Sequence, residues 1–259
     1  MRIMTCNIRC FGGNDGDNNW VYRKDFCTDV IRSRNPDLIG CQEVWAEQFA
    51  DLKAAFPEFD SYGLMDEPQT LRPMNVVFYR RETFDLICAG GYWLSETPHV
   101  TGSQSWDSAC VRLANWLRLV DRASGKEFRI INTHLDHRGQ TAREKQALLI
   151  CEDAASYPED YPQILTGDLN CDCQNPAIGV LKRNDWIDTF STVHGTEDPG
   201  FTYHAFQGPA FDAGQSRCGK MDWVFVQGHV VVKGAEVVMD ERNGHFPSDH
   251  YFVTAEIEL

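Results

Sequence analysis

Short apolar runs alternate with amphipathic stretches along this chain. The short runs are rich in Val, Ile and Phe and predict strands, several of them buried on both faces. The predicted strands cover residues 2–8, 37–40, 75–79, 128–132, 163–166, 223–226, 230–232 and 251–257. Apolar residues at helical spacing predict helices over residues 20–34, 45–56 and 140–156.

The middle of the chain, residues 84–121, lacks a helical period and predicts long antiparallel strands joined by a polar loop at 95–108. Long loops in compact domains are usually functional. We therefore expect this loop, flanked by Trp93 and Trp106, to form one wall of a substrate cleft, although both tryptophans fit a core position equally well. No linker or repeat interrupts the chain, so the mixed order of strands and helices predicts one α/β domain over residues 1–259, with two packed sheets and helices outside.

Composition narrows the possible partners. The chain has 38 acidic and 24 basic residues, a net charge of −14, so its average field repels polyanions and predicts weak nucleic-acid binding at most. No segment reaches membrane-spanning length and no signal peptide is recognisable, so we expect a cytoplasmic monomer without membrane contact. The ten cysteines form no CxxC pair, which argues against a zinc ribbon, and Cys171 and Cys173 are interpreted as loop thiols rather than soft-metal ligands.

Polar residues stand where the predicted strands begin or end. A turn would explain each of these polar residues or pairs taken alone, but six of them at six strand ends predict a functional site. The residues concerned are Asn7, Glu43, His134, Asp168 with Asn170, Asp222, and Asp249 with His250.

These residue types favour a metal-assisted reaction. If the chain is still extended at Asp168 and Asn170, both side chains point the same way, as a carboxylate that orients water and an amide that donates to a charged oxygen. An Asx turn explains the same segment equally well. Glu43 is a lone carboxylate at a strand end, which suits Mg²⁺ or Mn²⁺ better than zinc, particularly with Asn7 and Asp249 nearby.

Asp222 enters an apolar run and so needs a partner, for which His250 is the obvious candidate. A carboxylate bonded to one imidazole nitrogen fixes the tautomer and leaves the other nitrogen free for substrate or water. His134 could contact a phosphoryl oxygen, protonate a leaving group or merely satisfy a backbone group. Because no nucleophile elbow is present, the set favours attack of water on phosphorus over covalent catalysis.

In this order, the segments resemble the endonuclease/exonuclease/phosphatase superfamily, which has the fold of DNase I. The resemblance extends from Asn7 to His250 and implies a four-layer α/β sandwich of two mixed, mostly antiparallel sheets with helices outside. It implies that Asn7, Glu43 and Asp249 bind the metal, that Asp168 and Asn170 position water and phosphoryl oxygens, that Asp222 supports His250, and that His134 and Arg112 contact phosphate.

Residues 91–98 and the segment Asp136-His137-Arg138-Gly139 are similar to a bacterial branch of this superfamily, which adds Trp93 and Arg138 as expected substrate contacts. The chain lacks the basic insertion, the repeats and the exposed aromatic hairpin of better-known relatives. We therefore expect a phosphoesterase that acts on a small phosphorylated molecule or a short nucleotide. A DNA or RNA nuclease and a non-catalytic binding module on the same fold are the alternatives.

Overall fold

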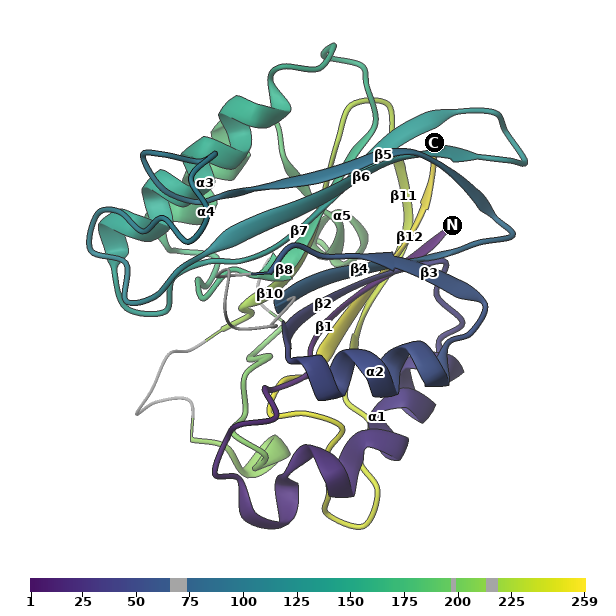
Figure 1. Ribbon diagram of the computed structural model, residues 1–259, viewed down its shortest axis with the longest axis vertical. Helices are drawn as coiled ribbons and strands as arrows, with labels where there is room; N and C mark the ends of the chain where they lie inside the picture. The colour runs from purple at the N-terminus through teal and green to yellow at the C-terminus, as the bar shows by residue number, and fades with distance from the viewer. Residues whose placement is uncertain (66–73, 197–198, 213–218) are drawn as a thin grey trace.

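Two six-stranded sheets lie face to face between two layers of helices (Figure 1). The computed structural model describes residues 1–65, 74–196, 199–212 and 219–259. The first sheet contains, in spatial order, β11 (Val231–Val238), β12 (Phe252–Glu258), β1 (Arg2–Asn7), β2 (Leu38–Val44), β4 (Met74–Arg80) and β3 (Phe59–Tyr62). The second contains β5 (Phe84–Trp93), β6 (Leu113–Asp121), β7 (Glu127–His134), β8 (Gln163–Asp168), β10 (Asp222–Gln227) and β9 (Ile187–Asp188). The predicted α/β sandwich is confirmed.

Helices cover the outer face of each sheet. The longer helices are α1 (Trp20–Ser33) and α2 (Ala46–Ala55) beside the first sheet and α3 (Gln140–Ala154) and α4 (Pro176–Arg183) beside the second (Figure 1). The short helices are η1 (Gly16–Asn18), α5 (Thr189–His194) and η2 (Gly208–Ala210). None of the helices in the described parts of the chain is both long and apolar enough to cross a membrane.

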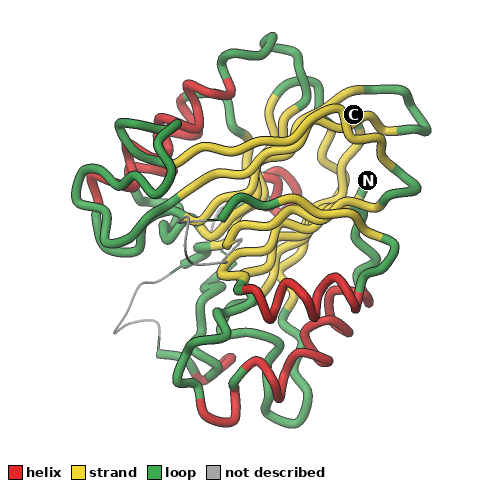
Figure 2. Tube along the Cα trace, viewed as in Figure 1, coloured by secondary structure: helices red, strands yellow, loops and turns green. Residues whose placement is uncertain are grey.

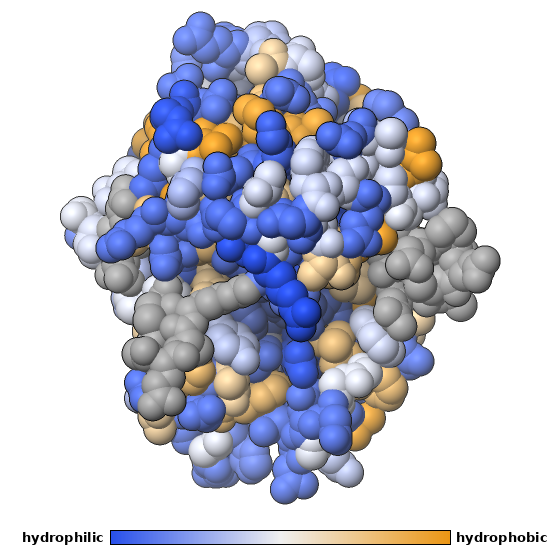
Figure 3. Space-filling model, turned by 90° about the vertical axis from the view of Figure 1, so that its left-hand side faces the viewer, coloured by the Kyte–Doolittle hydropathy of each residue, from blue (hydrophilic) through white to orange (hydrophobic). Residues whose placement is uncertain are grey.

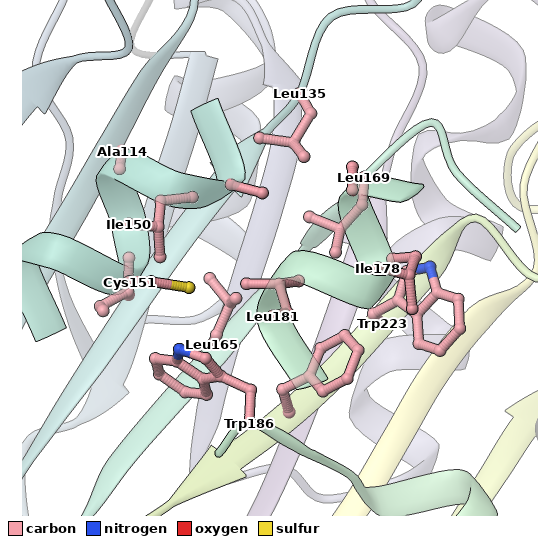
Figure 4. Close-up of a cluster of buried hydrophobic side chains, with 14 of the residues drawn as sticks. Ala114, Leu135, Ile150, Cys151, Leu165, Leu169, Ile178, Leu181, Trp186 and Trp223 are labelled. Atoms are coloured by element: carbon pink, nitrogen blue, oxygen red, sulfur yellow. The ribbon is translucent and has the colours of Figure 1, made fainter. Parts of the chain in front are cut away.

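Three apolar clusters separate these layers. One fills the space between the sheets, and another lies between the first sheet and helices α1 and α2. The third joins the second sheet to α3 and α4, where Leu165 and Trp223 of the sheet meet Ile150 and Leu181 of the helices (Figure 4). The central strands are therefore covered on both faces, as their continuous apolar runs predict, whereas the edge strands β5 and β11 keep exposed side chains.

The strand directions bring the predicted polar residues to one edge. Strands β1 and β2 are parallel, and so are β7 and β8, whereas β12 runs antiparallel to β1 and β10 antiparallel to β8. The ends of four strands and the beginnings of two others therefore lie on the same side of the molecule, where loops join them (Figure 2). In the second sheet, His134 and Asp222 are both in register with Asp168.

The sequence analysis predicted one strand too short and missed two helices. Strand β11 extends to Val238, beyond the predicted end at residue 232, and helices α4 and α5 were not predicted. For α4 the signals are present, because Asn175 accepts a hydrogen bond from Ala177 N and Pro176 occupies the first turn. Of the described cysteines, Cys6, Cys10, Cys27, Cys41, Cys88 and Cys151 are free thiols, and Cys218 lies outside the described residues.

A buried ion pair joins β9 to the segment before β10. Lys220 Nζ lies 2.8 and 2.7 Å from the two carboxylate oxygens of Asp188, and each side chain is only 1% exposed. Asp188 also accepts hydrogen bonds from the first amides of α5. Removing one partner of such a pair leaves the other charge buried and uncompensated.

Replacing Asp188 with Ala is expected to lower the free energy of unfolding by about 3–5 kcal/mol, because the ammonium loses this carboxylate and α5 loses its cap. Urea denaturation measures the effect. The double variant Asp188→Ala with Lys220→Met is expected to recover part of the loss. A decrease below about 1 kcal/mol for the single variant would show that the pair is not important for stability.

Candidate active site

A cavity of about 600 Å³ opens at the edge where the strand ends meet. It is lined by residues from both sheets, so it lies where the two sheets separate. Figure 3 shows this side of the molecule, where hydrophilic residues lie above a central hollow and a mixture of hydrophilic and hydrophobic residues lies below it. Of the residues with sequence-predicted roles, those lining the cavity are Glu43, Arg112, His134, Asp168, Asn170, Asp249 and His250.

His250 lies between two carboxylates. Its Nδ1 is 2.8 Å from Asp222 Oδ2, and its Nε2 is 3.8 Å from Asp168 Oδ2. Burial alone would lower the pKa of His250, but the charges of Asp222 and Asp168 raise it well above its usual value. Burial raises the pKa of Asp168 to about 7, with Asp222 adding to the effect and His250 opposing it. A carboxyl group with this pKa can exchange protons with water near neutral pH, beside an imidazole that holds its proton more tightly than usual.

Asn7 connects these catalytic-type residues to the predicted metal ligands. Its Nδ2 donates to Glu43 Oε1 at 3.1 Å and to Asp168 Oδ2 at 2.9 Å, while its Oδ1 accepts from Arg9 N at 3.0 Å. Glu43 Oε2 accepts from Cys10 N at 3.0 Å. The buried Asn7 amide therefore fixes the spacing between Glu43 and Asp168.

Negative charge accumulates beside Asn7. Burial raises the pKa of Asp249, and the neighbouring Glu43 raises it further, against the effect of His250. Burial would also raise the pKa of Glu43, but His250 and the Cys10 amide lower it overall. Arg9 reaches Asp249 at 3.8 Å but also binds Asp15 through two nitrogens. The carboxylates of Glu43 and Asp249 are therefore only partly neutralised.

This donor set fits a hard divalent cation. An ionised carboxylate offers about four lone-pair sites, and the hydrogen bonds described above leave sites free on both Glu43 and Asp249. Oxygen donors of this kind suit Mg²⁺ or Mn²⁺. Asn7 can add its Oδ1, although that oxygen already accepts from Arg9 N. Ligand atoms of Asp168, Asp222 and His250 also lie within 4.8 Å of one another and form a second group able to hold an ion.

Arg112 and His134 offer contacts for an anion. Both side chains are largely buried, and Arg112 Nε and His134 Nδ1 have no hydrogen-bond partner among the described residues. Burial, together with the positive charge of Arg112, lowers the pKa of His134 well below its usual value. His134 Nε2 lies 2.8 Å from Asn170 Nδ2 and 3.3 Å from Asp168 Oδ2. A guanidinium and an imidazole therefore line the cavity beside the carboxylates.

Asn170 departs from the conformation expected for it. The backbone is not extended there, because Asn170 has a φ of 50°, and its N–H donates to Asp168 Oδ1 at 2.9 Å. The segment is thus an Asx turn, and the extended backbone expected here was wrong, although Asp168 and Asn170 both line the cavity. Leu169 is fully buried, as expected. Arg9 and Glu43 share this left-handed conformation, with φ values of 56° and 62°, which is uncommon for residues other than glycine.

The structure does not bring Trp93 or Arg138 into the cavity. Trp93 is 7% exposed at the end of β5, and Arg138 has an exposed side chain outside the residues that line the cavity. The loop at 95–108 contributes no lining residue either. Instead it folds against the start of α3, where Asp107 Oδ1 accepts from Ala142 N at 2.6 Å. An apolar aromatic residue before a polar loop suits the core and a cleft wall equally, so the sequence could not distinguish them.

Several residues that line the cavity were not predicted. Trp45 follows Glu43 by two residues, and this proximity is the one signal that could have identified it. Tyr203 reaches the cavity because its backbone forms an isolated bridge with His250, and its ring lies 5.1 Å from the imidazole. The other lining residues outside the predicted set are Arg9, Cys10, Met74, His137 and Met221.

Comparisons with known proteins agree with this geometry. The sequence profile of the Endonuclease/Exonuclease/phosphatase family matches residues 4–250. A solved endonuclease/exonuclease/phosphatase from Bacteroides vulgatus is 34% identical, with a TM-score of 0.88 and coverage of 100% of this chain and 98% of that one. The mannosyl-6-phosphatase of Bacteroides thetaiotaomicron VPI-5482 is 27% identical, with a TM-score of 0.88 and full coverage of both chains. Nocturnin of Drosophila melanogaster is 24% identical over 281 residues, and the match covers 93% of this chain but only 42% of Nocturnin.

Proposed function

The chain belongs to the endonuclease/exonuclease/phosphatase family, and from this premise we propose that it is a divalent-metal-dependent phosphoesterase acting on a small phosphorylated molecule. One observation carries the proposal. His250, which is bonded to Asp222, and Asp168 share a cavity with the carboxylates of Glu43 and Asp249 and with the side chains of Arg112 and His134.

Each side chain has a role in hydrolysis at phosphorus. Arg112 and His134 bind the phosphoryl oxygens, while Asp168 and Asn170 orient the attacking water in line with the leaving group. Asp222 holds the His250 ring, which keeps a proton at the reacting centre. Glu43 and Asp249, with Asn7, would hold Mg²⁺ or Mn²⁺, which supplies a Lewis acid that neutralises charge on the phosphoryl group.

Two observations favour a small substrate. The cavity of about 600 Å³ is within the usual range for small-molecule sites, and the net charge of −14 opposes binding of long polyanions. The likeness to a mannosyl-6-phosphatase over the full length of both chains supports including sugar phosphates among the candidates. We also propose that the protein acts as a monomer.

A substrate panel tests the function. Purified protein with Mg²⁺ or Mn²⁺ is expected to release phosphate from p-nitrophenyl phosphate or a hexose 6-phosphate, or p-nitrophenol from bis-p-nitrophenyl phosphate, faster than it degrades oligonucleotides or plasmid DNA. The Asp168→Asn variant serves as a control for contaminating phosphatases, and it is expected to be inactive on every substrate. Turnover of nucleic acid alone would favour a nuclease, and an inactive wild type would favour a binding module.

Salt dependence provides an independent prediction. Between about 50 and 200 mM salt, kcat/KM on the best substrate is expected to change less than about threefold, because few phosphates are contacted. A protein that makes 6–10 phosphate contacts loses roughly 10³–10⁵ in affinity over this range. Of the arginines near the motifs, Arg143 is bonded to Gln140 and to the Asp136 carbonyl, and Arg9 is paired with Asp15. A steep loss of activity on DNA, with tight DNA binding by Glu43→Gln, would identify a nuclease instead.

A further inference from the structure

Trp45 places an aromatic surface in the cavity that phosphate chemistry does not need. Its half-buried side chain lines the cavity together with Glu43, two residues earlier in the chain. The face of an indole ring carries partial negative charge, so it does not attract a phosphoryl group. In the cavity it can contact an apolar or aromatic face of the organic part of a substrate. Met74 and Tyr203 add further apolar surface to the same cavity.

The position of the Trp45 ring depends on Gly12. A Cβ atom built on Gly12 would lie 2.2 Å from Trp45 Cη2 and 2.6 Å from Cζ3, far inside the contact distance of about 3.5 Å for carbon atoms. The backbone at Gly12 is not in the left-handed region that favours glycine. Glycine is therefore required there by its contact with the indole ring rather than by its own conformation.

Gln48 fixes the two segments that meet at this contact. Its buried Oε1 accepts from Trp45 N at 3.1 Å and from Phe11 N at 2.9 Å, and its Nε2 donates to Arg9 O at 2.8 Å. One fully buried side chain thus joins the start of α2 to the loop that carries Gly12. The backbone at Trp45 and the loop with Gly12, which contacts the ring, are thus held together before a ligand arrives, which lowers the entropy cost of binding.

We propose that Trp45 is a specificity-determining residue, which stacks on a ring carried by the leaving alcohol of the substrate. The inference rests on the proposed phosphoesterase function and adds the class of the leaving group. The shared chemistry is a flat ring face, which either a pyranose or a nucleoside can supply. An acyclic alcohol such as glycerol cannot supply it.

The test compares ring-bearing and acyclic esters. kcat and KM are measured with Mg²⁺ or Mn²⁺ for glucose 6-phosphate, adenosine 5′-monophosphate and glycerol 3-phosphate. In Trp45→Ala, the ratio of kcat/KM for the preferred ring ester to that for glycerol 3-phosphate is expected to fall roughly tenfold or more, mainly through KM. Trp45→Phe is expected to restore most of the ratio. If the ratio falls for glucose 6-phosphate, the ring is a pyranose, and if it falls for adenosine 5′-monophosphate, the ring belongs to a nucleoside.

Two further variants sharpen the result. Gly12→Ala is expected to displace the indole and to lower the same ratio with Trp45 intact. Tyr22→Ala removes an aromatic ring that is 74% exposed on α1 and is expected to leave the ratio unchanged. An equal loss on all three esters, or an unchanged ratio in a Trp45→Ala protein that melts like wild type, would overturn the proposal.

The role of Trp45 can be tested even if the protein has no phosphoesterase activity. If the wild type hydrolyses none of the three esters, calorimetry measures their Kd values for wild type and Trp45→Ala. Weaker binding confined to a ring-bearing ester would support the role of Trp45 despite the absent activity. Equal Kd values in the two proteins, or no binding by the wild type, would reject it.

Discussion

Asp222→Asn and His250→Ala are each expected to reduce turnover roughly a hundredfold or more, and the double variant is expected to be no slower than His250→Ala alone. The reason is their contact. His250 Nδ1 lies 2.8 Å from Asp222 Oδ2, and the other carboxylate oxygen has no hydrogen-bond partner among the described residues. Asp222 therefore acts through the imidazole. Once the ring is gone, the carboxylate has no remaining function in the reaction.

Turnover at saturating substrate measures this effect. The exposed Asp60 of β3 provides a matched control, since Asp60→Asn makes the same change of charge away from the cavity. Thermal melting should show that all variants are folded. If the losses of the two single variants instead multiply in the double variant, Asp222 and His250 act independently and the pair is not a unit.

Exhaustive chelation is expected to reduce turnover to background, and Mg²⁺ or Mn²⁺ is expected to restore it. The oxygens of Glu43 and Asp249 line the cavity with their charge only partly neutralised. Glu43→Gln keeps the shape of the side chain but removes one of these charges. The cation concentration that gives half-maximal activity should therefore rise at least about tenfold.

Stability provides a readout that does not depend on activity. A cation that binds the folded protein raises its melting temperature, so Mg²⁺ should raise the melting temperature of wild type more than that of Glu43→Gln. Glu47→Gln, on the exposed first turn of α2, is a nearby control with the same chemical change. Full activity after exhaustive chelation would contradict the proposed mechanism.

Much of the site could be predicted because its residues end or begin apolar runs. Asn7, His134 and Asp168 are the last residues of their strands, and Asp222 is the first of β10. The parallel pairs β1–β2 and β7–β8, together with the antiparallel pair β8–β10, then bring these positions to one edge. The pairing of Asp222 with His250 followed from the cost of burying an unpartnered carboxylate.

The other residues of the site could not be predicted, because their positions depend on tertiary structure. Trp93 and Trp45 both adjoin polar segments, yet Trp93 is in the interior and Trp45 lines the cavity. This difference depends on how the loop at 95–108 packs against α3, which the sequence does not show. Tyr203 belongs to no motif and reaches the cavity through its bridge to His250. The turn at Asn170 required knowledge of its backbone conformation.

The order of strands in the first sheet also determines when the site can form. Strand β1 lies between β2 and β12, and Asn7 and His250, whose side chains approach to 3.4 Å, are 243 positions apart in the chain. During synthesis, β1 can pair with β2 early, but its other edge remains open until β12 emerges. Such long-range pairing slows folding, and open strand edges promote aggregation of incomplete chains. The proposed active site is therefore complete only when β12 has paired with β1, and we expect a nascent chain that lacks β12 to be inactive.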